Sequence, residues 1–430
     1  MALTGRAPLL LLLGLVPVVL RPAASTVWIW IGLVGVVVLL DWALAVRPSK
    51  VAMVRRPTGQ VRLGDPATTT VAAENLASRR IVAVVRDAWQ PTAGATGNRH
   101  RLRLGPGESR VLVTSLTPVR RGDLQAAGVT VRSFGPLGIA ARQQTRQLPG
   151  TVRSLPPFES RRHLPSRLAR LRELDGRSAV RARGQGTEFD SLRNYVRGDD
   201  VRSIDWRATA RTPSVVVRTW QPERDRRVVL VLDTSRTSAA RVDDVPRLDS
   251  LMDAALLLAS LANRAGDRVD LVAGDNRVRA RLRVTGARDI AARLQDTMAD
   301  LEPVLVEADW QVLSSAVTRL GKQRALVVLL TSLDSSAVEE GLLPVLPALG
   351  RHHRLVLASV QDPALEALVA LRSSVDEVYD AAAAEQVLAG RRRTTETLGA
   401  LDVAVVDVPA DRLAPALADH YLGLKARGLL

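Results

Sequence analysis

The chain contains no cysteine, which excludes disulfides and thiolate metal sites. Histidine is scarce, and the few residues present have no metal-binding spacing. They are His100, His163, His352, His353 and His420. No Walker-type phosphate loop and no nucleophile elbow occurs, and the Gly-x-Gly at 184–186 does not open a helix after a strand as a dinucleotide fingerprint does. Without any of these signatures, we expect a protein that is not an enzyme.

Lysine is also nearly absent, so the net charge of +16 comes from arginine. A basic chain can bind nucleic acid or an anionic membrane surface. The arginines are spread along the whole sequence, and only Arg391–Arg393 form a tight cluster. This distribution favours the lipid bilayer over nucleic acid as a partner. The length of 430 residues allows two or three domains, and the 47% apolar content allows a large core.

Two apolar runs, 8–20 and 27–46, open the sequence. The second is long enough to span a bilayer. The first is either a signal peptide removed near Ala23 or the first half of a transmembrane hairpin over 1–50, and the hairpin is favoured because the second run follows almost at once. Arg47, Lys50, Arg55 and Arg56 follow the second run. By the positive-inside rule, we expect a two-span anchor in the cell membrane with the bulk of the chain cytoplasmic.

Asp41 is the only charged residue within the second run. It lies in the last third of the run, close to the basic residues that follow. Its carboxylate either extends towards the membrane interface or serves a function within the membrane. The first interpretation is the one that we expect.

The remaining sequence suggests three further parts. Residues 51–158 contain short alternating stretches separated by glycine and proline turns, which predicts a small β-sandwich. Residues 159–227 form a partly helical connector and a polar motif segment. Over 228–430, continuous apolar runs alternate with amphipathic helices, which predicts an α/β fold with a doubly wound, mostly parallel sheet. The stretch EVYD at 377–380 is interpreted as one of its strands.

The motif segment, 184–212, is too polar for a core element and too rich in large side chains for a linker. Its distinctive residues are Gly186, Glu188, Phe189, Arg193, Tyr195, Gly198, Asp199, Asp200, Arg202, Asp205, Trp206 and Arg211. In this order, and followed by a strand that ends Asp-Thr-Ser, they resemble the domain of unknown function 58 family. The resemblance implies a von Willebrand factor A-like domain on a membrane-anchored protein, often associated with MoxR-type AAA+ ATPases.

The acidic and basic residues of this segment can be interpreted in two ways. They can form charge pairs that hold the segment against the sheet, with Glu188 and Tyr195 orienting it and Trp206 anchoring it. Alternatively, Asp199, Asp200 and Asp205 can form an acid/base centre. We expect the structural role, and a hydrolase or transferase that uses the acidic cluster is the alternative.

Asp233-x-Ser235-x-Thr237 follows the first buried strand and resembles the metal-ion-dependent adhesion site of von Willebrand A domains. Carboxylate and hydroxyl oxygens suit Mg²⁺ with several retained waters. Asp334 leaves a second strand at the same sheet edge, where open α/β sheets bind ligands. The family pattern implies a threonine from the loop before the middle helix, where this chain reads Val306-Glu307-Ala308-Asp309. Either Asp309 replaces this threonine or the site is incomplete. Alternatively, these groups only satisfy strand-end backbone groups and cap the next helix.

These observations together favour a membrane-anchored, non-enzymatic adaptor or scaffold. The resemblance implies as partners a MoxR-type AAA+ ATPase and other membrane or envelope proteins. The ATPase would supply the energy, since the chain has no nucleotide site. A scaffold within a transglutaminase-like or cell-envelope assembly complex is a further alternative.

Overall fold

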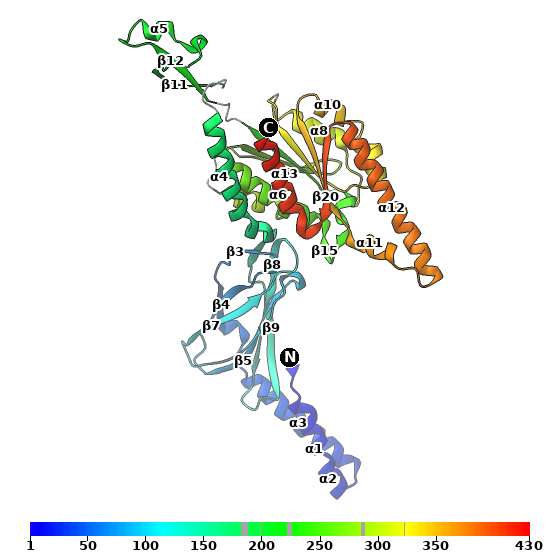
Figure 1. Cartoon of the computed structure of the whole chain (residues 1–430). Coiled ribbons are helices and arrows are strands. Elements are labelled where there is room, and N and C mark those ends of the chain that lie inside the picture. The colour runs from blue at the N-terminus through cyan, green and yellow to red at the C-terminus, as the bar shows by residue number, and fades with distance from the viewer. Residues whose placement is uncertain (182–187, 198, 222–225, 285–288, 322) are drawn as a thin grey trace. The chain divides into compact units, whose positions relative to one another are not determined.

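The computed structural model describes residues 1–181, 188–197, 199–221, 226–284, 289–321 and 323–430 (Figure 1). These form two compact units, Met1–Leu155 and Pro156–Leu430. The break falls close to the predicted end of the β-rich part at residue 158. Each unit is described separately below.

The first unit begins with three helices, α1 (Arg6–Leu13), α2 (Leu15–Leu20) and α3 (Ala24–Leu44). Gly14 separates α1 from α2, and a Cβ atom there would lie 2.2 Å from the Trp30 ring of α3. Glycine therefore allows α1 to approach α3, where the Trp30 indole donates a hydrogen bond to the Leu10 carbonyl (3.1 Å).

Among the described helices, one is long and apolar enough to cross a membrane, over Ala24–Lys50. A signal sequence near the N-terminus would pass the same test. The first apolar run forms only the shorter helical stretch Arg6–Leu20, below the roughly 20 residues that a span needs. The structure thus provides one candidate span, and the second span of the predicted hairpin is not shown.

Asp41 has a role that neither interpretation of the sequence included. Its side chain is 1% exposed and accepts hydrogen bonds from three backbone amides, those of Leu137, Ile139 and Ala140, each at 2.8 Å. These amides belong to the turn between β8 (Gly122–Phe134) and β9 (Ala140–Arg146). Asp41 therefore joins α3 to the sheet.

Two sheets make up the rest of the first unit. The smaller is antiparallel and consists of β2 (Val51–Arg55), β4 (Ala67–Asn75) and β7 (Ser109–Leu116). The larger contains β8 and β9 with β1 (Ala2–Leu3), β3 (Gln60–Arg62), β5 (Ile81–Trp89), β6 (Arg99–Leu104) and β10 (Thr151–Leu155). All its pairs are antiparallel except β10 with β3.

One hydrophobic core receives side chains from both of these sheets. Val71 and Leu112 come from the smaller sheet, and Val85, Leu102 and Val131 come from the larger one. Their alternation along each strand follows the period of two that an antiparallel sheet with one buried face requires. The prediction of antiparallel strands in this region is confirmed.

A six-stranded sheet organises the second unit. Its order is β17-β16-β13-β18-β19-β20, and only β17 runs antiparallel to its neighbour. The strands are β13 (Arg227–Asp233), β16 (Arg268–Gly274), β17 (Val278–Val284), β18 (Leu326–Leu330), β19 (Arg354–Gln361) and β20 (Val403–Pro409). The prediction of a mixed α/β fold with a mostly parallel sheet is confirmed.

Helices cover both faces of this sheet. Leu230 of β13 belongs to one core cluster, which includes residues of α4 (Leu164–Arg181), α6 (Arg247–Arg264), α7 (Ile290–Met298) and α13 (Ala410–Ala426). Its neighbours Val229 and Val231 belong to a second cluster, with residues of α8 (Trp310–Thr318), α10 (Leu346–Gly350) and α12 (Val375–Ala400). Burial on both faces explains why the strand sequences are continuously apolar.

The predicted strand at 377–380 is wrong, because α12 covers these residues. A capping box starts this helix: the Ser374 hydroxyl accepts from the Glu377 amide, and the Glu377 carboxylate accepts from the Ser374 amide. Both contacts satisfy helix-end amides that would otherwise lack partners. The alanines at 381–384 that follow are the best helix formers, so local propensity and capping together override the apolar Val378 and Tyr379.

Asp253 of α6 gives a pH-dependent prediction. Burial raises the pKa of this carboxyl to about 6, although Ser160 donates hydrogen bonds to it. Ionisation is therefore harder in the folded state, so stability falls as pH rises from about 4 to about 6. We expect Asp253→Asn to be more stable than the wild type at about pH 8, by at most about 3 kcal/mol. Thermal unfolding at about pH 4 should show little difference, and equal stability at both pH values would contradict the prediction.

Candidate functional site

The candidate site lies between β13 and β18, the central strands of the sheet. From β13 the chain first builds outward to β16 and β17, and it then returns to place β18 on the other side of β13. Open α/β sheets bind ligands at such a reversal of strand order, outside the carboxyl ends of the strands. Asp233 is the last residue of β13, and Thr331 follows the last residue of β18.

The Asp233 carboxylate accepts hydrogen bonds from several polar groups at this edge of the sheet. Its side chain is 1% exposed. One carboxylate oxygen accepts from the hydroxyls of Thr331 (2.6 Å) and Thr237 (3.1 Å), and the other accepts from the Ser235 amide (2.8 Å). The hydroxyls of Ser235 and Thr237 lie 3.2 Å apart. The residues of the predicted Asp-x-Ser-x-Thr motif thus lie together, and Thr331 joins them.

Burial raises the pKa of Asp233, and the hydrogen bonds from Thr331, Ser235 and Thr237 oppose this effect. No salt bridge involves Asp233 in the described part of the chain. A buried carboxylate without a cationic partner is costly to ionise. A cation bound beside Asp233 would reduce that cost.

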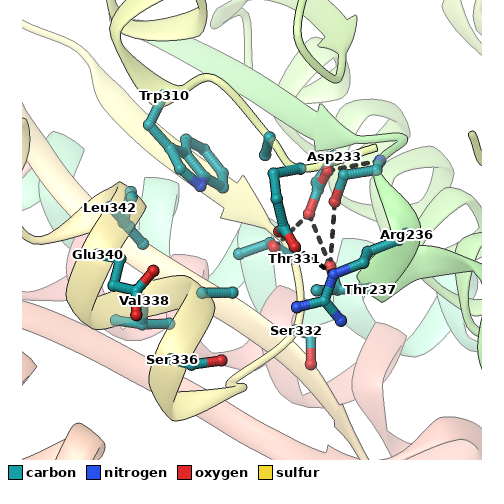
Figure 2. A pocket seen from close by; sticks show the side chains of 15 residues that line it. Asp233, Arg236, Thr237, Trp310, Thr331, Ser332, Ser336, Val338, Glu340 and Leu342 are labelled. Carbon is teal, nitrogen blue, oxygen red and sulfur yellow. Dashed lines mark hydrogen bonds and ion pairs between the residues drawn. The ribbon is translucent and has the colours of Figure 1, made fainter. Parts of the chain in front are cut away.

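A cavity of about 270 Å³ opens beside this carboxylate. Figure 2 shows Asp233, Thr237 and Thr331 close together, with Trp310 and Glu340 lying away from them on the cavity wall. Glu340 belongs to a π-helical turn, Val338–Leu342, a form that is rare and frequent at functional sites. Gly341 of this turn packs on Trp310, where a Cβ atom would lie 3.0 Å from the ring.

Asp309 and Asp334 do not line this cavity. Asp309 caps α8 by accepting from the amides of Gln311 and Val312 (3.0 Å each). Asp334 caps the short helix α9 (Ser335–Ala337), accepting from the Ala337 amide (3.2 Å) and the Ser336 hydroxyl (2.8 Å). Each of these caps uses a single carboxylate oxygen, so the structure shows the capping role that the sequence left open as the alternative for Asp309 and Asp334.

The oxygen groups around Asp233 suit a hard cation only in part. One carboxylate and three hydroxyls, those of Ser235, Thr237 and Thr331, offer the ligand types that Mg²⁺ prefers. Glu307 and Glu340 line the same cavity. However, no group of three or more acidic or histidine side chains suited to a metal exists among the described residues. The residues therefore fit a weakly charged Mg²⁺ site that retains several waters.

Arg247, the first residue of α6, places a positive charge at the same edge. Its guanidinium donates to the Thr237 carbonyl (2.5 Å) and to the Ser332 hydroxyl (3.2 Å). Burial, together with the nearby Arg391, lowers the pKa of Arg247. Its Nε atom is buried without a hydrogen-bond partner. Arg247 therefore joins the segments that follow β13 and β18, and it does not line the cavity.

The motif segment forms a separate hairpin, which we call the arm (residues 188–221). Its strands β11 (Glu188–Asn194) and β12 (Val216–Gln221) pair antiparallel. Between them lie a 3₁₀ turn at Val201–Ser203 and helix α5 (Trp206–Thr209). Figure 1 shows α5 at the end of the two strands.

The carboxylates of the arm stabilise its own connector. Asp199 accepts from both terminal nitrogens of Arg193 (2.6 and 2.8 Å). Asp205 caps α5 and accepts from Arg218 (2.8 Å), and Asp200 caps the 3₁₀ turn. The Arg193 contact lowers the pKa of Asp199, and the Ala208 amide, followed by Arg218, lowers that of Asp205. Weakly basic carboxylates of this kind are poor general bases near neutral pH.

Trp206 does not anchor the arm by burial, because 69% of its side chain is exposed. The prediction that Trp206 anchors the segment against the sheet is therefore wrong. Every hydrogen bond that the structure gives the described side chains from Leu192 to Arg218 stays within the arm. Gly186 and Gly198 lie outside the described residues, as do the side chains of Glu188 and Phe189. Tyr195 is half-buried, and the guanidiniums of Arg202 and Arg211 are exposed.

Three cavity residues were not chosen as site residues from the sequence. Thr331 was recognisable only as a strand-end hydroxyl, because its contact with Asp233 spans 98 positions. Glu340 lies within a stretch that predicts an ordinary helix, and Trp310 has the pattern of a core residue. Nothing in the local sequence marks either of them as part of a cavity wall.

Comparison with known proteins finds a family model that matches part of the chain. Residues 191–395 match the family model described as "Protein of unknown function DUF58". The match covers slightly less than half of the chain and includes most of the motif segment that resembles this family. It is 27% identical over 182 residues to uncharacterized proteins of Mycobacterium bovis and Mycobacterium tuberculosis, a match that covers 42% of this chain and 56% of each relative. The chain thus aligns with about half the length of these relatives.

Similarity to solved structures is low. One match is the human complex of zinc 2-glycoprotein and prolactin inducible protein (TM-score 0.20, 13% identity, 26% of this chain and 95% of that chain). Another is the CARDB domain of the PF1109 protein from Pyrococcus furiosus in complex with di-metal ions (TM-score 0.18, 17% identity, 24% and 91%). Scores at this level carry no argument about this chain.

Proposed function

We propose that this chain is a membrane-anchored, non-enzymatic adaptor whose second unit is a von Willebrand A-like domain. The unit would bind a protein partner through an acidic side chain of that partner and Mg²⁺ held near Asp233. A MoxR-type AAA+ ATPase would act with it in complex assembly or cell-envelope processes. The observation that carries the proposal is the group of Asp233, Ser235, Thr237 and Thr331 at the reversal of strand order.

The residues of the site would divide this work. Asp233 and the three hydroxyls would hold the ion, which supplies an open position for a carboxylate. Trp310 would give the cavity a rigid wall, because it is 5% exposed and packs beside Gly341. The alternative of a hydrolase or transferase has less support, because Asp199 and Asp205 are occupied with arm contacts and have lowered pKa values.

Co-purification tests this function. The full chain and a MoxR-type ATPase would be co-expressed and extracted in detergent, with Mg²⁺ or with a chelator. We expect the ATPase to be retained with Mg²⁺ and lost with the chelator or with Asp233→Ala. Asp309→Ala is the matched control, because it removes a carboxylate that lies outside the cavity. Equal retention by the wild type and Asp233→Ala would contradict the proposal.

The proposed orientation gives a separate prediction. The basic residues after α3, Arg47 and Lys50 among them, favour a cytoplasmic location for the rest of the chain. Protease added to intact cells should then leave the second unit undigested, whereas permeabilised cells should show its digestion. Cleavage of the second unit in intact cells would reverse the topology.

A further inference from the structure

The tip of the arm exposes large apolar side chains. Val196, Val201 and Trp206 are 61%, 62% and 69% exposed. All three lie in the connector between β11 and β12. Exposed apolar groups that gather on one short segment mark an interaction surface more often than a free one.

The arm tip is also cationic. The guanidiniums of Arg193 and Arg218 are neutralised by Asp199 and Asp205. In the part of the chain that the structure describes, four other exposed arginines of the tip form no salt bridge. They are Arg197, Arg202, Arg207 and Arg211. Arginine and tryptophan are the side chains most enriched at the energetic centres of protein interfaces.

A surface of opposite charge lies on the helical hairpin formed by α11 (Pro363–Ala370) and the first half of α12. No residue of α11 is buried, and Figure 1 shows α11 beside α12. Val375, Val378 and Tyr379 are 72%, 50% and 73% exposed. Six acidic residues and a single arginine, Arg372, lie between 362 and 387. The acidic residues are Asp362, Glu366, Asp376, Glu377, Asp380 and Glu385.

We propose that the arm tip of one copy of this chain docks on the acidic α11–α12 hairpin of a second copy. Each surface has exposed apolar side chains, and each carries the charge that the other lacks. An acidic patch is notable in a chain with a net charge of +16. No hydrogen bond or salt bridge joins the arm to 362–387 within one copy, among the described residues. This proposal does not depend on the metal site.

The two docking surfaces are different, so the contact is heterologous. After one contact forms, the copy that used its arm keeps a free α11–α12 hairpin, and the copy that used its hairpin keeps a free arm. Heterologous contacts generate rings when the rotation closes and open arrays when it does not. A protein that assembles in this way would offer its partner many copies of the Asp233 site side by side.

Charge reversal on full-length protein in detergent tests the proposal, with sedimentation velocity as the readout. The arm variant carries Arg202→Glu and Arg207→Glu, and the hairpin variant carries Asp376→Arg and Asp380→Arg. We expect the wild type to self-associate with rising concentration and each variant to associate at least about tenfold more weakly. Combining all four changes in one chain should restore association. Arg392→Glu with Arg393→Glu, a double reversal on exposed residues of α12 outside the hairpin, should have no effect.

Mixing distinguishes contact between copies from contact within one copy. The arm variant keeps an intact hairpin and the hairpin variant keeps an intact arm. A mixture of the two should therefore associate, because intact surfaces can pair with each other and reversed surfaces can do the same, although each variant alone associates weakly. Added salt should weaken the wild-type association, because exposed charge pairs are screened. A wild type that stays monomeric at every concentration reached would overturn the proposal, as would an arm variant that associates as strongly as the wild type. A failure of Mg²⁺-dependent partner binding would leave this result unchanged, so the two proposals fail separately.

Discussion

Asp41→Ala is expected to destabilise the first unit by roughly 3–6 kcal/mol, because several buried backbone amides lose their acceptor at once. The amides of Ile139 and Ala140 are buried, and that of Leu137 is partly so. Gly135 lies close enough that a Cβ atom there would be 2.3 Å from the Asp41 carboxylate. A side chain at position 135 would therefore clash with Asp41. Thermal unfolding in detergent and proteolysis of the turn at 135–139 would measure the effect.

Two controls make this result specific. Asp41→Asn keeps one acceptor oxygen and should lose about half as much stability, because a hydrogen bond to a neutral acceptor is weaker than one to a charged group. Asp123→Ala removes an exposed salt bridge with Arg153 and should cost less than about 1 kcal/mol. If Asp41→Ala behaves like Asp123→Ala, Asp41 does not hold the turn.

Magnesium is expected to raise the melting temperature of the full chain, and Asp233→Ala should abolish this response. An ion that binds only the folded state stabilises it by linkage, by about 2.7 kcal/mol at one hundred times the dissociation constant. Thr331→Val should weaken the response, because it removes one hydroxyl while nearly keeping the volume of the side chain. The readout is thermal unfolding over a titration with Mg²⁺ or Mn²⁺.

The control for this titration is Asp309→Ala. It should lower stability by about 1 kcal/mol through loss of a helix cap, yet its metal response should match that of the wild type. If the wild type shows no metal response, or if Asp233→Ala keeps one, the site does not hold an ion. The domain would then bind partners through its surface alone.

The central sheet was predictable because both its faces are buried. Val229 and Leu230 of β13 face opposite core clusters. The central positions of this strand are therefore all apolar, and a continuous apolar run of this kind is easy to recognise in the sequence. Asp233, Ser235 and Thr237 were predictable together, because they leave one strand end within five residues. Thr331 could be placed at the same sheet edge as a hydroxyl that follows a buried strand. Its direct contact with Asp233 could not be predicted, since that contact depends on which strand lies beside β13.

Other assignments were ambiguous because one residue type suits two roles. Asp309 and Asp334 have oxygen ligands suited to a metal, yet each precedes a helix, which is the preferred position of a capping aspartate. Trp206 has the size of a core anchor, but residue type alone does not reveal exposure. Asp41 could not be assigned from the sequence, because the amides that it binds lie 96 or more positions away.

The contacts of Asp41 have a mechanical consequence. They converge on one side chain of α3, and Arg142 of β9 adds a hydrogen bond to the Trp42 carbonyl (3.0 Å) and stacks on the Trp42 ring at 4.5 Å. Rotation of α3 about its long axis would break these contacts. Movement of α3 is therefore transmitted directly to the sheet. If α3 crosses a bilayer, a thinner membrane would tilt the helix. That tilt would turn β8 and β9 with it, so membrane thickness would set the angle of the first unit.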